Sequence, residues 1–408
     1  MEAIYKTHQF PNGIRLIHRH HDSAVAHFGM IVQTGTRDEE EAEHGLAHFI
    51  EHMFFKGTER RTAFQIISRL EDVGGDINAY TTKEETAIHA SFLRQDYRRA
   101  VDLIHELFIS STFSIRERRK EIDVIISEIQ SYEDSPSELI FDDAEELLYP
   151  GQSIGRNILG TRKSLKKFQN GMVENFFREN YSTDEIVLCS LGSVDFSKLV
   201  MMISRTFGEI PLKSRIRPRI RPFCSNGQQL TVRKRTHQTH CILITEGYDL
   251  HHEDRLALHL LNNILGGPGM NSRLNLALRE RRGYSYSAES HYAPYTDTGA
   301  LAVYFSCDRE KFDSCYELAI KEIRSLSEKD LTPGRLTSAR KQIIGQLAIS
   351  SDIPEHLLLT MGKSYQLFHT VDSLEDIRMK LEQISAARLK SIARQVFEPE
   401  RLNTLIYT

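Results

Sequence analysis

The chain has 408 residues, enough for two or three domains with large cores. Its net charge is −4 and 26% of its residues are charged, so composition excludes a broad basic surface for nucleic acid or anionic membrane. No apolar run reaches the length of a bilayer span, and the first residues lack the layout of a signal peptide.

The five cysteines are scattered along the chain and form no Cys-x-x-Cys pair. This pattern indicates reduced thiols in a cytosolic compartment and disfavours a zinc site made of cysteines. We therefore expect a cytoplasmic protein that binds neither nucleic acid nor a membrane.

The first segment that carries chemistry is a predicted helix at residues 46–53. Its apolar residues recur at helical spacing from Leu46, and residues on its other faces are also largely apolar, so we expect a buried helix. His48 and His52 lie one turn apart, where two imidazoles can bind one metal ion. Glu51 lies beside them and can reach a water molecule at that ion. A metal would also satisfy polar groups that are costly to bury unpaired. The segment predicts a zinc hydrolase.

The pattern His-x-x-Glu-His does not by itself decide this interpretation. The chain holds 18 histidines and 56 acidic residues, enough for the pattern to arise by chance. A hydrogen-bonded pair of core histidines is the plain alternative. A third ligand would separate the two, because a catalytic zinc takes three protein ligands and a water.

A predicted helix at residues 117–130 offers candidates for this ligand. It has an apolar stripe that starts at Ile122, and Glu121 and Glu128 lie two turns apart beside the stripe. One carboxylate can be a ligand and the other can support a ligand from behind. Taken singly, each would be a solvated surface glutamate.

A basic, proline-containing stretch at residues 210–222 follows near the midpoint. It predicts an extended linker, with domains at 1–212 and 223–408 joined by residues 213–222. An arm that binds nucleic acid is the alternative, which the lack of interleaved aromatic residues disfavours.

The two halves resemble a diverged repeat. Each half has a strand, a helix, a second strand and an amphipathic helix in the same order. The corresponding ranges are 27–35 and 240–247 for the first strand, 46–53 and 256–263 for the helix, 86–92 and 299–305 for the second strand, and 96–109 and 311–327 for the amphipathic helix. In this register Leu258, Leu261 and Asn262 align with His48, Glu51 and His52, so the second half lacks the ligands. The order predicts an α+β fold of two homologous domains, each with helices packed on a mostly antiparallel sheet.

Together these segments resemble the M16 (pitrilysin) family, which includes insulysin and the mitochondrial processing peptidase, and within it the shorter, bacterial-type M16B branch. His-x-x-Glu-His is the inverzincin signature of that family. The family pattern has a Glu 76 residues after the second His, which is Glu128 here, and a second Glu seven residues earlier, which is Glu121. Almost the whole chain takes part, and further matching segments are 74–82, 181–187, 265–274 and 281–287.

The resemblance implies a zinc metalloendopeptidase with one Zn²⁺ per chain, bound by His48, His52 and Glu128. It implies that Glu51 is the general base and later passes the proton to the leaving amine. Glu121 would orient a ligand or modulate the site.

Two further segments are implied in substrate binding. The first resembles the family's edge strand, which holds a peptide by strand addition, and comprises Asn78, Ala79, Tyr80 and Thr81. An ordinary hairpin strand is the alternative. Arg282 and Tyr286 match a family pair that would face the zinc from the second domain, bind the substrate carbonyl and stabilise the oxyanion.

The resemblance also implies a bacterial homodimer whose two domains form a clamshell and close around short or unfolded peptides. One alternative is a dedicated peptidase that processes a leader or a modified peptide. Another is a non-catalytic scaffold subunit, a role in which this fold serves respiratory complexes. The scaffold alternative predicts lost ligands, whereas both histidines and both glutamates of the site are present.

Overall fold

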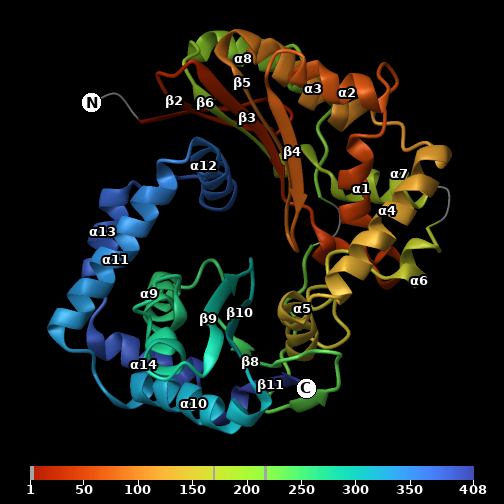
Figure 1. The fold of residues 1–408 in the computed structure, drawn as a ribbon. Coiled ribbons are helices and arrows are strands. Elements are labelled where there is room, and N and C mark those ends of the chain that lie inside the picture. The colour runs from red at the N-terminus through yellow and green to blue at the C-terminus, as the bar shows by residue number, and fades with distance from the viewer. Residues whose placement is uncertain (1–3, 169–170, 216–217) are drawn as a thin grey trace. The chain divides into compact units, whose positions relative to one another are not determined.

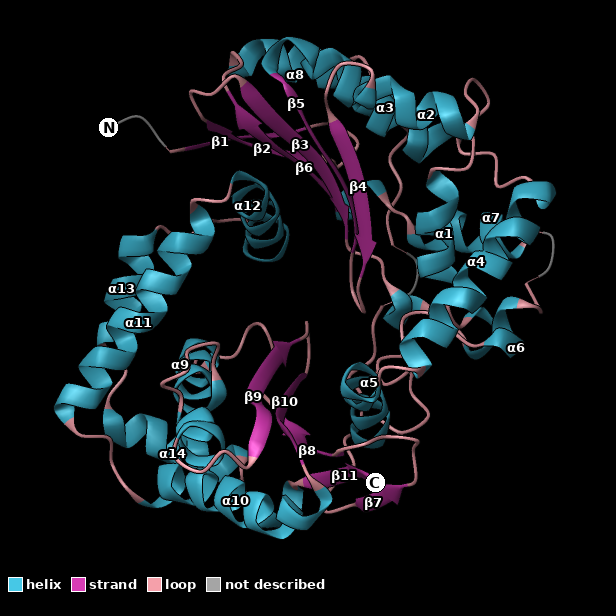
Figure 2. Ribbon diagram, viewed as in Figure 1, coloured by secondary structure: helices cyan, strands magenta, loops and turns pink. Residues whose placement is uncertain are grey.

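The computed structural model describes residues 4–168, 171–215 and 218–408, and its fold class is α+β with two domains, as predicted (Figures 1 and 2). The chain forms two compact units, each built from three segments. Unit 1 comprises Met1–Ile129, Ile158–Arg219 and Ile349–Val371, and unit 2 comprises Gln130–Asn157, Ile220–Ala348 and Asp372–Thr408. Within the described ranges, no helix has the length and apolar character needed to cross a bilayer.

Unit 1 is built on a six-stranded sheet in the order β1-β2-β6-β3-β5-β4. All neighbours are antiparallel except β2 and β6, which are parallel. The central strands β3 and β6 are buried along almost their whole length, as their apolar sequences predict. The strands are β1 (Tyr5–Gln9), β2 (Arg15–His20), β3 (Val25–Val32), β4 (Asp76–Thr81), β5 (Thr86–Leu93) and β6 (Ile186–Gly192).

Helices cover both faces of this sheet (Figure 2). The main core lies between the sheet and helices of the first half, with large side chains such as Phe28, Phe49 and Phe176 fully buried. The helices of unit 1 are α1 (Leu46–Phe54), α2 (Ala63–Glu71), α3 (Tyr97–Ser110), most of α4 (Ile115–Glu133), α6 (Arg162–Leu165), α7 (Met172–Asn180), α8 (Phe196–Ser204) and α12 (Pro354–Phe368).

Unit 2 has a five-stranded sheet in the order β7-β11-β8-β10-β9. Its strands are β7 (Gln229–Val232), β8 (Thr239–Glu246), β9 (Ser285–Pro294), β10 (Gly299–Cys307) and β11 (Asn403–Tyr407). Its helices are α5 (Pro136–Leu148), α9 (Arg255–Gly266), α10 (Phe312–Glu328), α11 (Pro333–Ser351, most of it), α13 (Leu374–Glu382) and α14 (Ala386–Val396), with a π-helix at Asn275–Glu280.

The two sheets repeat one topology. The order β2-β6-β3-β5-β4 in unit 1 corresponds to β7-β11-β8-β10-β9 in unit 2, and the first pair is parallel in both. Helices α1 and α9 follow β3 and β8 in the chain, and α3 and α10 follow β5 and β10. The repeat read from the sequence is therefore present in the topology.

The compact units differ from the predicted contiguous domains, 1–212 and 223–408, because each unit takes one helix from the other half of the chain. Helix α5 packs on β8 and β11, where its residues Ile140 and Leu148 contact the cluster around Ile242 and Ile244. An apolar helix face needs an apolar partner, and the open face of the second sheet supplies it.

Helix α12 makes the reciprocal contact on the sheet of unit 1 (Figure 1). Leu358 and Met361 pack with Ile31 and Val187. At Gly362 the helix backbone approaches so closely that a Cβ would lie 2.7 Å from the Cδ1 atom of Ile31. The change from unit 1 to unit 2 at Arg219 and Ile220 falls within the predicted linker, 213–222, of which residues 216–217 lie outside the described residues.

Candidate metal centre

Helix α1 presents both predicted histidine ligands and the predicted base. The residue before it, Gly45, has a φ of 93°, a left-handed conformation that favours glycine. The apolar side of α1, including Phe49 and Ile50, is fully buried, and the helix packs against β4 and α7. Burial of α1 in the core thus fixes the direction in which His48 and His52 project.

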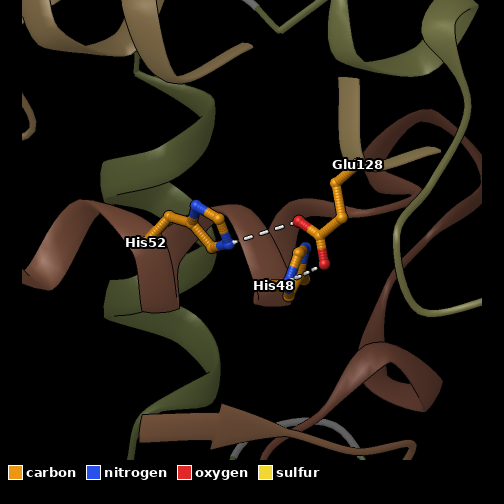
Figure 3. A group of neighbouring side chains, drawn as sticks. All are labelled: His48, His52 and Glu128. Carbon is orange, nitrogen blue, oxygen red and sulfur yellow. Dashed lines mark ion pairs between the residues drawn. The ribbon is translucent and has the colours of Figure 1, made fainter. Parts of the chain in front are cut away.

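His48, His52 and Glu128 converge from α1 and α4 (Figure 3). Their ligand atoms all lie within 4.8 Å of one another. The Nε2 atom of His48 is 4.0 Å from Oε1 of Glu128, and Nε2 of His52 is 3.7 Å from Oε2. His48 is 7% exposed, whereas the Glu128 side chain is 44% exposed, so the group opens to solvent on the α4 side.

This donor set suits zinc. Two imidazole nitrogens and one carboxylate oxygen are typical of catalytic zinc sites, which keep a fourth position open. Tetrahedral ligands at ordinary zinc bond lengths lie about 3.4 Å apart. The two separations between Glu128 and the histidines, 3.7 and 4.0 Å, are slightly longer. Burial, together with the nearby charge of His52, lowers the pKa of His48 to about 3. His48 is therefore neutral, the form that binds a metal.

Glu121 supports His52 from the side away from Glu128. The Nδ1 atom of His52 donates a hydrogen bond of 2.9 Å to Oε1 of Glu121, and Nζ of Lys56 lies 2.9 Å from Oε2. Burial raises the pKa of the Glu121 carboxyl, but the hydrogen bonds from His52 and Lys56 outweigh this and hold the pKa below its usual range. The carboxylate thus keeps the proton of His52 on Nδ1 and leaves Nε2 as an acceptor.

We expect Glu121→Gln to weaken zinc binding by about tenfold, because outer partners of this kind typically contribute 10- to 100-fold in affinity. The neutral amide holds the Nδ1 proton less strongly and leaves Lys56 without its charged partner. Zinc competition with a chromophoric chelator measures the effect. Glu117→Gln is the matched control on the same helix, because Glu117 pairs with the exposed Lys120. Wild-type affinity in Glu121→Gln would contradict the supporting role.

Glu51 is half-buried on α1 beside the group of His48, His52 and Glu128, which is called the metal cluster below. The pKa of its carboxyl is raised, chiefly by burial and in addition by the charge of Glu128. The Thr81 side chain and the charge of His52 lower this pKa but do not cancel the upward shift. A carboxylate with a raised pKa accepts a proton more readily near neutral pH and can release it again. The environment of Glu51 therefore fits a general base.

The predicted substrate strand, β4, lies at the edge of the sheet of unit 1 (Figure 1). In the described part of the chain it pairs with β5 alone, so its outer backbone groups face no other strand. Of its four predicted residues, Asn78 is exposed and Ala79 is half-buried. Tyr80 serves packing, because its ring lies under Lys363 of α12 and its hydroxyl donates to Glu85.

Arg282 and Tyr286 belong to unit 2. Arg282 follows the π-helix Asn275–Glu280 and donates from Nη1 to the carbonyl of Ala277 at 2.9 Å. Tyr286 lies on β9 and is 65% exposed. π-helical turns are rare and often occur at functional sites. The approach of this pair to the metal cluster stays a prediction.

Two residues near the site carried no clear sequence signal. Glu39 is 4% exposed and accepts hydrogen bonds from the backbone N–H groups of Gly45 (2.9 Å) and Ala47 (2.8 Å), at the start of α1. An acidic residue next to the first turn commonly marks the start of a helix. Glu39 lies seven positions before Leu46, too far away to be recognised as such a residue from the sequence. Lys56, the second partner of Glu121, resembles any surface lysine in the sequence.

Two family models match the chain: Insulinase (Peptidase family M16) over residues 15–162, and Peptidase M16 inactive domain over residues 167–343. A Bacillus subtilis protein named Uncharacterized zinc protease YmxG is 30% identical over 405 residues, which covers 99% of this chain and 98% of that protein. The chain belongs to the M16 peptidase family. The M16B branch within it stays a prediction.

Other proteins are similar to the chain over nearly its full length. A Streptomyces coelicolor protein named Uncharacterized zinc protease SCO5738 is 29% identical and covers 95% of this chain and 86% of that protein. A solved protease from Helicobacter pylori has a TM-score of 0.93 at 17% identity and covers 99% of both chains. A solved M16 inactive domain from Pseudomonas fluorescens has a TM-score of 0.90 at 17% identity, with 99% of this chain and 97% of that chain covered. These structures share the fold.

Proposed function

We propose that this M16 chain is a zinc metalloendopeptidase that hydrolyses short or unfolded peptides. The observation that carries the proposal is the convergence of His48, His52 and Glu128, with Glu51 on the same helix and Glu121 bound to His52. The names of the relatives, which call them zinc proteases, support both the metal and the reaction class.

His48 and His52 would hold Zn²⁺ through neutral imidazole nitrogens, and Glu128 through its carboxylate, with one ion per chain. Bound zinc supplies Lewis acidity, which lowers the pKa of a water molecule to about 7 and polarises a carbonyl oxygen. Glu121 keeps His52 in the tautomer that leaves Nε2 free. The half-exposed Glu128 leaves the solvent side of the group open to a peptide.

Glu51 moves the proton. It accepts a proton from the attacking water as the new C–O bond forms at the scissile carbonyl carbon. It then donates that proton to the amine nitrogen as the C–N bond breaks, so the carboxylate is regenerated. Its raised pKa favours both transfers.

The substrate would lie as an added strand along the free edge of β4, with main-chain hydrogen bonds to its backbone. Thr81, at the end of that strand, lies beside Glu51 and would bring the scissile bond close to the base. Arg282 and Tyr286, both exposed in unit 2, would stabilise the oxyanion if the two units close around the peptide. The homodimer implied by the resemblance stays a prediction.

Two alternatives predict different behaviour. A dedicated processing peptidase would cut one leader or modified peptide and leave most of a mixed library intact. A scaffold subunit would cut nothing, and the complete set of ligands and base in this chain disfavours it.

A digest of a mixed peptide library, read by mass spectrometry, tests the proposal. We expect the zinc-loaded chain to cleave many peptides, the chelator-treated chain to cleave none, and zinc to restore cleavage. A stable globular protein in the same mixture should remain intact. Absence of cleavage by a chain shown to contain zinc would refute the peptidase, and cleavage of a single class of sequence would favour the processing alternative.

A further inference from the structure

The basic segment between residues 210 and 222 carries two arginines, Arg215 and Arg219, whose side chains are mostly buried. Nε and Nη2 of Arg219 donate to the two carboxylate oxygens of Asp38 at 3.0 and 2.9 Å. Nη2 also donates to the carbonyls of Gln33 (3.2 Å) and Glu84 (2.8 Å). Nη2 of Arg215 donates to the same Gln33 carbonyl at 2.7 Å and lies 3.1 Å from Asp38. The Arg219 side chain is 9% exposed, so it is docked in unit 1 and not solvated.

Asp38 is the last residue of a short 3₁₀ helix, Thr36–Asp38, whose backbone and side chains are hydrogen-bonded to neighbouring segments. Its carboxylate also accepts from the backbone N–H of Gly35 at 3.0 Å. The backbone N–H groups of Thr36 and Arg37 donate to the carbonyls of Thr82 and Lys83, in the turn after β4, and Arg37 pairs with Glu84. Burial raises the pKa of Asp38, but the two arginines and the Gly35 N–H outweigh this and hold it below its usual range. Asp38 is thus a buried carboxylate whose two oxygens both accept hydrogen bonds.

The next residue, Glu39, connects this 3₁₀ helix to α1. Its carboxylate holds the N–H groups of Gly45 and Ala47, and Ala47 is adjacent to His48. The first N–H groups of a helix have no partner within the helix, so Glu39 supplies what the start of α1 lacks. The path from Arg219 to the turn that carries His48 consists of the Arg219–Asp38 ion pair, the peptide bond between Asp38 and Glu39, and the hydrogen bonds from Gly45 and Ala47 to Glu39.

Buried ion pairs are weak evidence of a gain in stability, because their replacement by apolar groups is often neutral or stabilising. In some proteins such a pair instead specifies one geometry. Here the fixed geometry is that of the loop before α1 and of the turn after β4. The first segment leads into α1, which carries His48. The second follows β4, which ends at Thr81, beside Glu51.

We propose that Arg219, through Asp38 and Glu39, is a positioning residue that orients the start of α1, so that this arginine of the predicted linker contributes to zinc affinity. This inference rests on the proposed zinc site. It identifies a role for the linker that neither its basic composition nor its place between the units predicts.

Zinc affinity of the full chain tests the proposal, by competition of Zn²⁺ with a chromophoric chelator. We expect Arg219→Gln to weaken zinc binding by about tenfold and Glu39→Gln by about 10- to 100-fold, the range of outer partners of a metal site. Arg219→Lys keeps the charge but not the paired donors, and should fall between wild type and Arg219→Gln. The matched control is Arg221→Gln, which removes the same charge two residues later, where the side chain is 67% exposed and pairs with Glu246.

The double variant Arg219→Gln/Glu39→Gln tests the route. If Arg219 acts through Glu39, the double variant should bind zinc within about twofold of Glu39→Gln alone, because coupled residues are not additive. The absorption spectrum of bound Co²⁺ reports ligand geometry and should change in Arg219→Gln but not in Arg221→Gln.

Each outcome decides a point. Wild-type zinc affinity and an unchanged Co²⁺ spectrum in folded Arg219→Gln would overturn the proposal and leave the arginine with a role in stability only. Fully additive effects would overturn the route through Glu39. If Arg219→Gln fails to fold, Arg219→Lys decides by the same measurements. A wild-type chain that binds no zinc would refute the proposed function instead, which keeps the two failures distinct.

Discussion

Glu51→Gln is expected to keep zinc and to lower peptide hydrolysis by about 10²–10⁴-fold, the usual contribution of a general base. Glutamine has nearly the same shape as glutamate but cannot accept the proton of the attacking water. Glu51 is absent from the group of ligand atoms, so zinc content should not change. Zinc titration and kcat/KM on a fluorogenic peptide measure the two quantities in the same sample.

Glu71→Gln is the matched control for this variant. It makes the same chemical change at an exposed carboxylate at the end of α2, in the same unit. It should retain wild-type zinc content and activity. Full activity in Glu51→Gln would remove Glu51 from the mechanism, whereas loss of zinc together with activity would show that Glu51 helps to hold the metal.

Glu128→Gln is expected to weaken zinc binding by more than about a hundredfold. Zinc sites with four ligands bind with about 10–16 kcal/mol, so one ligand corresponds to roughly 3 kcal/mol. The Glu128 side chain is 44% exposed on α4, so its replacement should leave the fold intact. Activity should disappear at low free zinc and return in part when zinc is added in excess. Chelator competition and a zinc-dependent activity curve measure both effects.

Asp123→Asn provides the control for Glu128, the proposed third ligand. Asp123 is exposed on the same helix and lies outside the metal cluster, so this variant should bind zinc like the wild type. Equal zinc affinity in Glu128→Gln and Asp123→Asn would exclude Glu128 as a ligand and return the histidines to the alternative of a hydrogen-bonded core pair.

The residues that converge in the metal cluster were predictable, because local geometry encodes them. Helical spacing places His48 and His52 one turn apart, and burial on one side of α1 follows from its apolar residues. The prediction of Glu128 as the third ligand needed more than local geometry. Its position on the helix did not distinguish it from Glu121, and only the family pattern did. In the structure the two carboxylates lie at different atoms of one histidine: Glu121 contacts Nδ1 of His52, and Glu128 faces Nε2.

The predicted substrate strand, β4, shows how much of the structure a local sequence pattern predicts. An edge strand at residues 76–81 is present, but Tyr80 turns under α12, a helix more than 270 residues later in the sequence. Alternation along a strand states which side chains share a face. It does not state which distant helix covers that face, and the exchange of α5 and α12 between the halves went unpredicted for the same reason.

The sequence by itself determined the α+β repeat, the pair of histidines and the loss of ligands in the second half, because periodicity and register are properties of neighbouring residues. Only the tertiary structure decided the partners of the charges. Arg219 meets Asp38 across 181 residues, and His52 meets Glu121 across 69. A charged side chain carries no local sign of its partner, since any opposite charge satisfies it electrostatically, and long-range packing selects which one comes within reach.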